Sequence, residues 1–127
     1  MSTTILTVDD SATVRQLVRS ALEAEGYQVC EATHGVEALE VLATTHVDCV
    51  ITDLYMPVMD GLTLVREIRA LEAYRFTPVL LLTTESGDET KRAGREAGAT
   101  GWLVKPFRRE QLRQVVLRVL GGVRAGA

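Results

Sequence analysis

Residues that build disulfide scaffolds, zinc sites and membrane spans are scarce in this sequence of 127 residues. The only two cysteines, Cys30 and Cys49, each lie in an apolar stretch, where a free cysteine usually behaves as a small buried hydrophobe. Neither a cysteine cluster nor a pair of imidazoles is available for zinc. No apolar run approaches the roughly 20 residues that a membrane-spanning helix needs. These absences favour one globular domain.

A secretory signal is also missing. Residues 1–4 pass directly into a strand-like stretch, without the basic segment and the apolar segment of a signal peptide. We therefore expect a cytoplasmic protein. The 46% of apolar and 24% of charged residues are usual for a globular domain of this length.

Basic residues are few in the first two thirds of the chain. Up to residue 90 there are 15 acidic and 5 basic residues, whereas from Lys91 onward there are 2 acidic and 9 basic residues. The formal net charge of −3 therefore combines an acidic part with a basic part. A domain that is basic as a whole would indicate a nucleic-acid partner, and this distribution does not.

What the sequence does contain is an alternation of five short apolar runs with five helical patterns. The runs lie at 5–8, 27–32, 47–52, 78–83 and 101–104. Helical spacing occurs at 14–22, 36–43, 64–71, 88–97 and 112–120, and Val36, Leu39, Leu42 and Ala43 mark the second helix. We expect one domain at 1–120 and a frayed tail at 121–127.

Strands that alternate with helices predict a parallel sheet with right-handed crossovers and helices on both faces. The fold class is therefore α/β, a doubly wound five-stranded parallel sheet. In such open sheets, a ligand binds beyond the carboxyl ends of the strands. The residues that end the strands are thus the candidates for chemistry.

Acidic, hydroxyl and ammonium groups stand at four of these strand ends. The first strand ends at Asp9 and Asp10, the third at Asp53, the fourth at Thr83 and the fifth at Lys105. Each has an ordinary explanation when taken singly, since Asp10 could cap the first helix and Lys105 could be a solvated charge. The five together are much harder to explain by chance.

A cluster of three carboxylates predicts a divalent metal ion. Two carboxylates about 4 Å apart repel by roughly 1 kcal/mol in water, and by about 4 kcal/mol at an effective dielectric constant near 20. Oxygen ligands favour magnesium, with manganese as a substitute. With its charge balanced, Asp53 can act as nucleophile toward a phosphoryl donor while Asp9 and Asp10 hold the metal. The Lys105 ammonium and the Thr83 hydroxyl can stabilise the incoming group.

Four motifs make the sequence resemble the response-regulator receiver family over essentially its whole length. They are Val8-Asp9-Asp10-Ser11, Asp53-Leu54-Tyr55-Met56-Pro57 with Met59-Asp60-Gly61, Leu82-Thr83-Thr84-Glu85 and Lys105-Pro106-Phe107. Within this family, the sequence is most similar to the stand-alone chemotaxis regulators of the CheY type. The resemblance implies a flavodoxin-like sheet with strand order 2-1-3-4-5 and a cis Lys105–Pro106 peptide bond.

The resemblance also implies a function. Asp53 would accept a phosphoryl group from a histidine kinase, and Asp10, Asp53 and the backbone carbonyl of Tyr55 would contact magnesium, with Asp9 acting mainly through water. The protein would be a phosphorylation-activated switch of a two-component system, most similar to those of chemotaxis and flagellar motor control. It would catalyse only its own phosphorylation and dephosphorylation. A phosphorelay intermediate or a phosphate sink is the alternative.

Five residues around the cluster would carry the switch. In the family, Thr83 and Lys105 contact the phosphoryl group, and movement of Thr83 is coupled to an aromatic residue on the fifth strand. That residue is most often Tyr or Phe, whereas here it is Trp102, for which simple packing is the alternative. Tyr55 and Glu85 occupy two variable positions that set the dephosphorylation rate in the family.

The basic third of the chain covers the usual output face of the family, formed by the fourth helix, the fifth strand and the last helix. We expect an acidic segment of a target protein, such as the flagellar motor switch, to bind a monomer there; an ordinary solvated face is the alternative. No contact with nucleic acid or insertion into a membrane is expected. The residues assigned to this face are Lys91, Arg92, Arg95, Trp102, Arg108, Arg109 and Arg113.

Other classes of protein share parts of this pattern. A flavodoxin-like cofactor binder needs a phosphate-binding loop after the first strand, where Asp9 and Asp10 would repel a phosphate. A haloacid-dehalogenase-like phosphatase has a second aspartate two residues after its nucleophile, where this chain has Tyr55. A degenerate receiver that only binds proteins is disfavoured by the intact acidic cluster.

Overall fold

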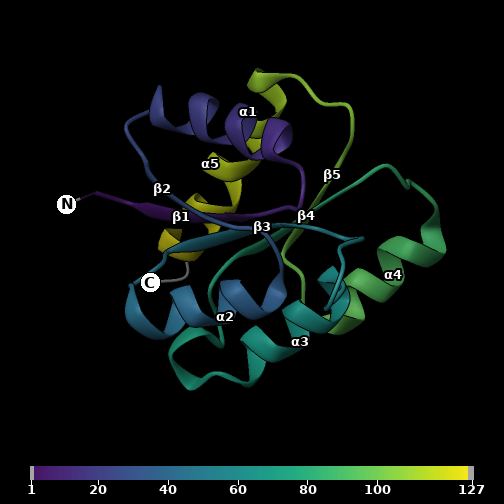
Figure 1. The fold of residues 1–127 in the computed structure, drawn as a ribbon. Coiled ribbons are helices and arrows are strands. Elements are labelled where there is room, and N and C mark those ends of the chain that lie inside the picture. The colour runs from purple at the N-terminus through teal and green to yellow at the C-terminus, as the bar shows by residue number, and fades with distance from the viewer. Residues whose placement is uncertain (1, 126–127) are drawn as a thin grey trace.

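A computed structural model describes residues 2–125 of the chain (Figure 1). Strands and helices alternate along it from the first strand to the last helix. The elements are β1 (Thr4–Val8), α1 (Ala12–Glu23), β2 (Gln28–Ala32), α2 (Gly35–Thr44), β3 (Cys49–Asp53), α3 (Gly61–Ala70), the 3₁₀ turn η1 (Glu72–Tyr74), β4 (Val79–Thr83), α4 (Asp88–Ala97), β5 (Gly101–Val104) and α5 (Arg109–Ala125). Among the described residues, no helix has both the length and the hydropathy that a membrane span requires.

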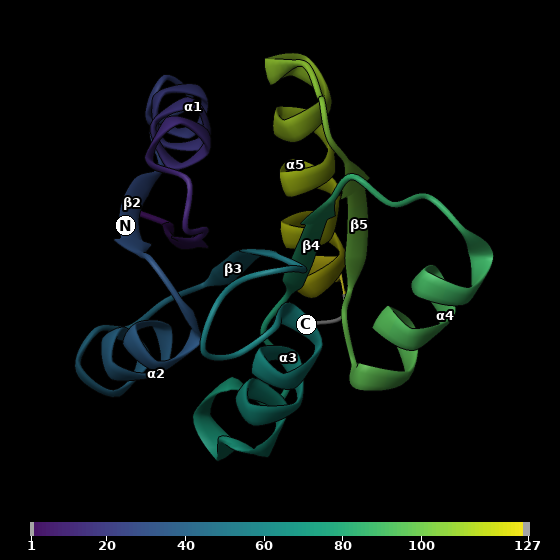
Figure 2. The ribbon, with the colours of Figure 1, turned by 45° about the vertical axis from the view of Figure 1, so that its right-hand side comes forward.

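The five strands form one parallel sheet in the order β2-β1-β3-β4-β5. Helices α1 and α5 cover one face, and α2 and α3 cover the other, with α4 beside β5 at the sheet's edge (Figure 2). The predicted fold class and strand order are therefore confirmed.

The central strands are apolar on both sides because helices cover both faces of the sheet. All residues of β3 and β4 are buried, and neighbours along β4 alternate between two cores. Leu80 packs with α1 and α5, whereas Leu81 packs with α2 and α3. Each such side chain contributes roughly 1.5–3 kcal/mol when fully buried. Both cysteines are free, and burial with the nearby charge of Asp48 raises the pKa of the Cys49 thiol to about 12.

Short polar side chains start the helices that flank the sheet's carboxyl edge. The Ser11 hydroxyl accepts a hydrogen bond from the Val14 N–H at 3.2 Å and caps α1. Asp60 Oδ1 accepts the Thr63 N–H at 2.8 Å and caps α3. Because Ser11 is the cap of α1, the carboxylate of Asp10 is not needed to start that helix.

Two details differ from the sequence-based expectation. The buried face of α2 consists of Gly35, Ala38 and Leu42, whereas Val36 and Ala43 of the predicted stripe are exposed. An apolar helix such as α2 offers more than one apolar face, and periodicity alone does not select the face that packs. Helix α5 continues to Ala125, where the sequence predicts a frayed tail from 121; residues 126–127 of that tail lie outside the described residues.

Candidate functional site

The carboxyl ends of β1, β3, β4 and β5 meet at one edge of the sheet and bring the predicted residues together. Asp9 follows β1, Asp53 ends β3, Thr83 ends β4 and Lys105 follows β5. The Lys105 N–H donates to the Thr83 carbonyl at 2.7 Å, which continues the pairing of β4 and β5 past their ends. The Lys105–Pro106 peptide bond is cis, as the resemblance implies.

Three carboxylates converge at this edge. One oxygen from each of Asp9, Asp10 and Asp53 lies within 4.8 Å of the other two. Asp9 and Asp53 are buried, at 1% and 8% exposure, whereas Asp10 faces solvent. Buried carboxylates are costly unless a cation or hydrogen-bond donors compensate their charge.

Lys105 supplies part of that compensation. Its ammonium lies 3.0 Å from Asp9 Oδ2 and 3.1 Å from Asp53 Oδ1. Burial lowers the pKa of Lys105, but the hydrogen bonds and charges of the two carboxylates outweigh it and leave that pKa raised. Burial, followed by the charge of Asp9, raises the pKa of Asp53, and Lys105 opposes this only in part. Two carboxylates therefore share one ammonium, and the site keeps an excess of negative charge.

The two oxygens of Asp53 have different surroundings. Oδ1 accepts hydrogen bonds from Lys105 and from the Leu54 N–H, the latter at 3.0 Å. Oδ2 accepts none from the part of the chain that the structure describes. Helix α3 begins directly behind this residue, because Gly61 has no side chain; a Cβ at Gly61 would lie 2.4 Å from the Asp53 carbonyl oxygen. The side chain is thus held through one oxygen and open at the other.

Asp9 is held from three directions. Its Oδ1 accepts the Ser11 N–H at 2.9 Å, its Oδ2 accepts Lys105, and its carbonyl accepts Arg15 Nη1 at 2.6 Å. Arg15 also pairs with Glu31 at 2.9 Å, which orients the guanidinium. Sequence reasoning missed Arg15, because an arginine on the first turns of a helix resembles any solvated charge.

The donor set fits a hard divalent cation. Two ligands of an octahedral magnesium ion at about 2.1 Å lie at most roughly 4.2 Å apart. The three carboxylate oxygens lie within 4.8 Å of one another, which is close to this spacing. The carboxylates that could hold the ion are those of Asp9, Asp10 and Asp53.

A chain of hydrogen bonds connects Thr83 to Trp102 through Glu85. The Thr83 hydroxyl oxygen accepts the Glu85 N–H at 3.1 Å, and the Trp102 indole N–H donates to the Glu85 carbonyl at 3.3 Å. The Glu85 carboxylate accepts the Tyr55 hydroxyl at 2.8 Å and the Thr90 hydroxyl at 3.1 Å. The hydrogen bond with Glu85 raises the pKa of the Tyr55 hydroxyl. The loops after β3 and β4 are thereby joined across the site. No motif or spacing in the sequence indicated that Thr90 takes part.

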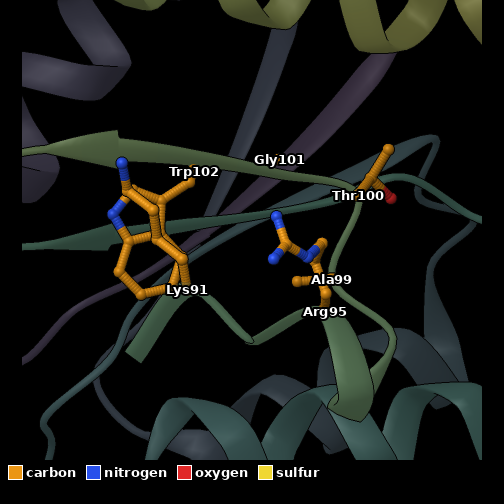
Figure 3. Close-up of a pocket in the computed structure, with 6 residues that line it drawn as sticks. All are labelled: Lys91, Arg95, Ala99, Thr100, Gly101 and Trp102. Carbon is orange, nitrogen blue, oxygen red and sulfur yellow. The ribbon is translucent and has the colours of Figure 1, made fainter. Parts of the chain in front are cut away.

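Trp102 lies beside a hollow of about 160 Å³ with two basic side chains, Lys91 and Arg95 (Figure 3). The indole ring packs on α4 at Gly94, where a Cβ would lie 2.9 Å from Trp102 Cζ3 and 3.0 Å from Leu81 Cδ1. Gly94 thus provides the space that a large indole requires. The sequence carried a signal for this, since a glycine inside a helix costs about 1 kcal/mol and often marks a close contact.

Replacing Gly94 with Ala is therefore expected to push the Trp102 ring outward. Because Trp102 is the only tryptophan, its emission should shift to longer wavelength and become more accessible to acrylamide. Gly121→Ala is the matched control, since this glycine also lies in a helix but has nothing within 4 Å of an added Cβ. Unchanged emission in Gly94→Ala would contradict the packing described for Trp102.

The basic residues expected on the output face lie at two separate places. Lys91, Arg95 and Trp102 lie together, and Arg92 is exposed on the same helix. Arg109 instead donates to the Ser20 hydroxyl of α1. Arg113 pairs with Glu110 at 2.9 Å and lies 3.9 Å from Glu25, just after α1. The last two arginines thus face α1, and Arg108 is exposed near the start of α5.

A family model described as the response regulator receiver domain matches residues 5–117. The chain belongs to the response-regulator receiver family. Receivers of this family are phosphorylation-dependent switches of two-component systems, so the predicted family and general function are confirmed.

Individual relatives support this assignment. The chain is 40% identical over 119 residues to the chemotaxis protein CheY1 of Helicobacter pylori, an alignment that covers 92% of this receiver and 96% of that protein. The structure of CheY4 of Vibrio cholerae, a chemotaxis response regulator, matches with a TM-score of 0.91 at 44% identity and covers 94% of this chain and 99% of that one.

A third relative is a receiver domain of a Pseudomonas aeruginosa sensor histidine kinase, solved with a magnesium ion coordinated in its active-site cleft. It matches with a TM-score of 0.87 at 30% identity and covers 95% of this receiver and 99% of that chain.

Proposed function

We propose that this receiver accepts a phosphoryl group on Asp53 from a histidine kinase, with magnesium held by Asp10, Asp53 and the carbonyl of Tyr55. Manganese, which also prefers oxygen ligands, would serve as a substitute. One observation carries the proposal: Asp53 is a nearly buried carboxylate, held at Oδ1 by Lys105 and Leu54, with Oδ2 open beside two further carboxylates.

The open oxygen is the proposed nucleophile. Asp53 Oδ2 attacks the phosphorus of the donor; a new O–P bond forms, the P–N bond to the kinase histidine breaks, and its electron pair leaves with the imidazole. When bound, magnesium neutralises the carboxylates and the charge of the incoming phosphoryl oxygens. Lys105 lies next to Asp53 and can move one of its N–H donors from a carboxylate to a phosphoryl oxygen.

Thr83 is the proposed sensor of phosphorylation. Its hydroxyl oxygen accepts the Glu85 N–H, so its own proton is free to donate to a phosphoryl oxygen on Asp53. Movement of Thr83 toward that group would shift Glu85, whose carbonyl accepts the Trp102 indole. Trp102 would thereby report the state of Asp53 to α4 and β5.

Tyr55 and Glu85 are proposed to control dephosphorylation. Their hydrogen bond closes the gap between the loops that follow β3 and β4, and both side chains are exposed at the mouth of the site. On the side of these loops, the approach of water to an acyl phosphate on Asp53 is restricted by this bridge. Its presence therefore favours a longer-lived phosphorylated state.

The partners are proposed from the surface and from the relatives. The hollow of Lys91, Arg95 and Trp102 presents two positive charges and an aromatic ring, which suits an acidic segment of a target protein in the cytoplasm. The chemotaxis relatives favour a target such as the flagellar motor switch, bound by a monomer. A phosphorelay intermediate or phosphate sink would share the same site but would not need this surface.

Incubation with acetyl phosphate, a small acyl phosphate donor, tests the function directly. Intact-mass measurement at short times is expected to show the gain of one phosphoryl group in the presence of magnesium, and none when EDTA is present. A gain of equal size in EDTA would contradict the role of the metal, and no gain at any magnesium concentration would contradict the proposed function.

A further inference from the structure

Helix α2 carries apolar residues beyond the face that it buries in the core. Its buried residues are Gly35, Ala38 and Leu42, and Leu39 packs partly against the same core, whereas Val36 is 42% exposed and Ala43 is exposed. Residues 36, 39 and 43 follow helical spacing, so they form a stripe that flanks the buried face of the helix.

This outer stripe borders a groove between α2 and the segment that ends α3 and forms η1. The groove has a volume of about 420 Å³, within the range of roughly 300–1,000 Å³ that is typical of binding pockets. Its apolar lining consists of Leu39, Leu42, Ala43, Leu71, Ala73 and Tyr74. The Tyr74 hydroxyl donates to the carbonyls of Leu42 and Thr45 at 3.0 and 2.9 Å, which connects η1 to α2 at the floor of the groove.

Acidic side chains rim the groove. Glu67 of α3 and Glu72 of η1 line it, and both are exposed. Glu40 lies on α2 next to the apolar stripe and is exposed as well. Arg75 follows on the same turn, but it does not line the groove. The charge at the rim is therefore negative and would attract a positively charged partner.

Past Glu72 and Ala73 lies a second hollow of about 250 Å³, whose lining is mixed and includes the polar residues His46, Asp48 and Thr77. There Phe76 is 84% exposed and adds an aromatic ring to this surface. Residues at the amino ends of β3 and β4, including Val47 and Pro78, line this hollow. The surface thus lies at the sheet edge opposite to the carboxyl ends where Asp53 stands.

We propose that the groove between α2 and η1 docks a basic amphipathic helix of a partner protein, independently of phosphorylation at Asp53. The groove is lined by helical segments and offers no strand edge, which suits a helix with apolar anchors on one face. Lysine or arginine residues beside the anchors would meet Glu67 and Glu72. A second copy of the chain fits less well, because its basic helix α4 has no large apolar residue to insert, and among the described side chains of α5 only one large apolar residue, Leu117, is exposed.

A synthetic peptide of about 18 residues, long enough to form a helix, is the probe. It carries leucines at positions i, i+3, i+4 and i+7 and lysines elsewhere, and an equivalent with glutamates in place of the lysines tests the charge. Titration into the ¹⁵N-labelled protein is expected to shift amide signals of α2, η1 and the start of β4. The expected affinity for the glutamate peptide is at least about tenfold lower.

Variants separate this groove from the rest of the surface. Leu71→Ser should weaken binding about tenfold or more, and Glu67→Lys and Glu72→Lys should each weaken it measurably. Leu117→Ser and Glu96→Lys are matched controls on exposed positions of α5 and α4, and they should leave the affinity unchanged. Magnesium and beryllofluoride, which mimic the phosphorylated state, should not alter it either.

Three results would overturn the proposal. They are signal shifts centred on α4 and β5, an affinity that Leu71→Ser does not change, and an affinity that beryllofluoride changes strongly. Concentration-dependent self-association in sedimentation that Leu71→Ser abolishes would identify a second copy as the occupant instead. Phosphoryl uptake from acetyl phosphate is measured separately, so its failure would leave this test unaffected.

Discussion

Replacing Asp53 with Asn is expected to abolish the phosphoryl mass gain from acetyl phosphate while the protein stays folded. The amide has nearly the same shape, and its oxygen can still accept the hydrogen bonds of Lys105 and of the Leu54 N–H. It cannot form an acyl phosphate, because it lacks the second carboxylate oxygen. Intact-mass measurement under identical magnesium and donor concentrations checks the result.

The stability of the same variant provides a second measurement. The pKa of Asp53 is raised in the fold, so its ionised form is less favourable there than in the unfolded chain. The stability of the metal-free wild-type protein should therefore fall as pH rises through the folded-state pKa of Asp53. Asp53→Asn removes this loss, and its thermal midpoint without metal at neutral pH should equal or exceed that of the wild type.

Asp60→Asn is the matched control for both measurements. Asp60 is exposed and caps α3, and asparagine is an equally good cap, so fold and phosphoryl uptake should be retained. A full mass gain in Asp53→Asn, or its loss in Asp60→Asn, would contradict Asp53 as the acceptor.

Replacing Asp10 with Ala is expected to produce two effects of opposite sign. Magnesium binding should weaken at least about tenfold, since even residues behind the ligands of a metal contribute about 10–100-fold. The metal-free protein should become slightly more stable, by up to about 1 kcal/mol, because one of three clustered carboxylates is removed. Ser11, rather than Asp10, caps α1, so no cap is lost.

Thermal unfolding in EDTA and in a magnesium series checks both effects together. The wild-type midpoint should rise with magnesium, as expected when a ligand binds only the folded state, and the Asp10→Ala midpoint should rise much less. Glu96→Ala, a change at an exposed acidic residue of α4, should behave like the wild type. A clear loss of stability in metal-free Asp10→Ala would show that Asp10 supports the fold rather than an ion.

The strand-end cluster was visible in the sequence because of a simple geometric rule. Parallel strands place their carboxyl ends at the same edge of a sheet, so residues far apart along the chain must meet once the strands are recognised. Asp9 and Asp53 were assigned to such ends, and the structure joins them through Lys105. The roles of these residues in phosphoryl transfer stay predictions until the variants above are measured.

The switch region was less accessible to sequence reasoning. Trp102 was recognised by its position, but the hydrogen bond of its indole to the Glu85 carbonyl and its contact with Gly94 depend on how β5, α4 and the loop after β4 come together. Likewise, nothing in the spacing of Arg109 and Arg113 shows that both turn toward α1. Basic residues on one helix look equivalent in a sequence, although some of them contact a neighbouring helix and others do not.

The sequence by itself determined the fold class, the order of the elements and the set of acidic, hydroxyl and ammonium groups at the sheet's edge. These follow from local periodicity and from the chain geometry of parallel strands. Only the tertiary structure decided which face of α2 packs, how the Trp102 ring packs against Gly94, and where an apolar groove with an acidic rim remains exposed. Such contacts depend on the shapes of side chains from distant segments, which no local pattern encodes.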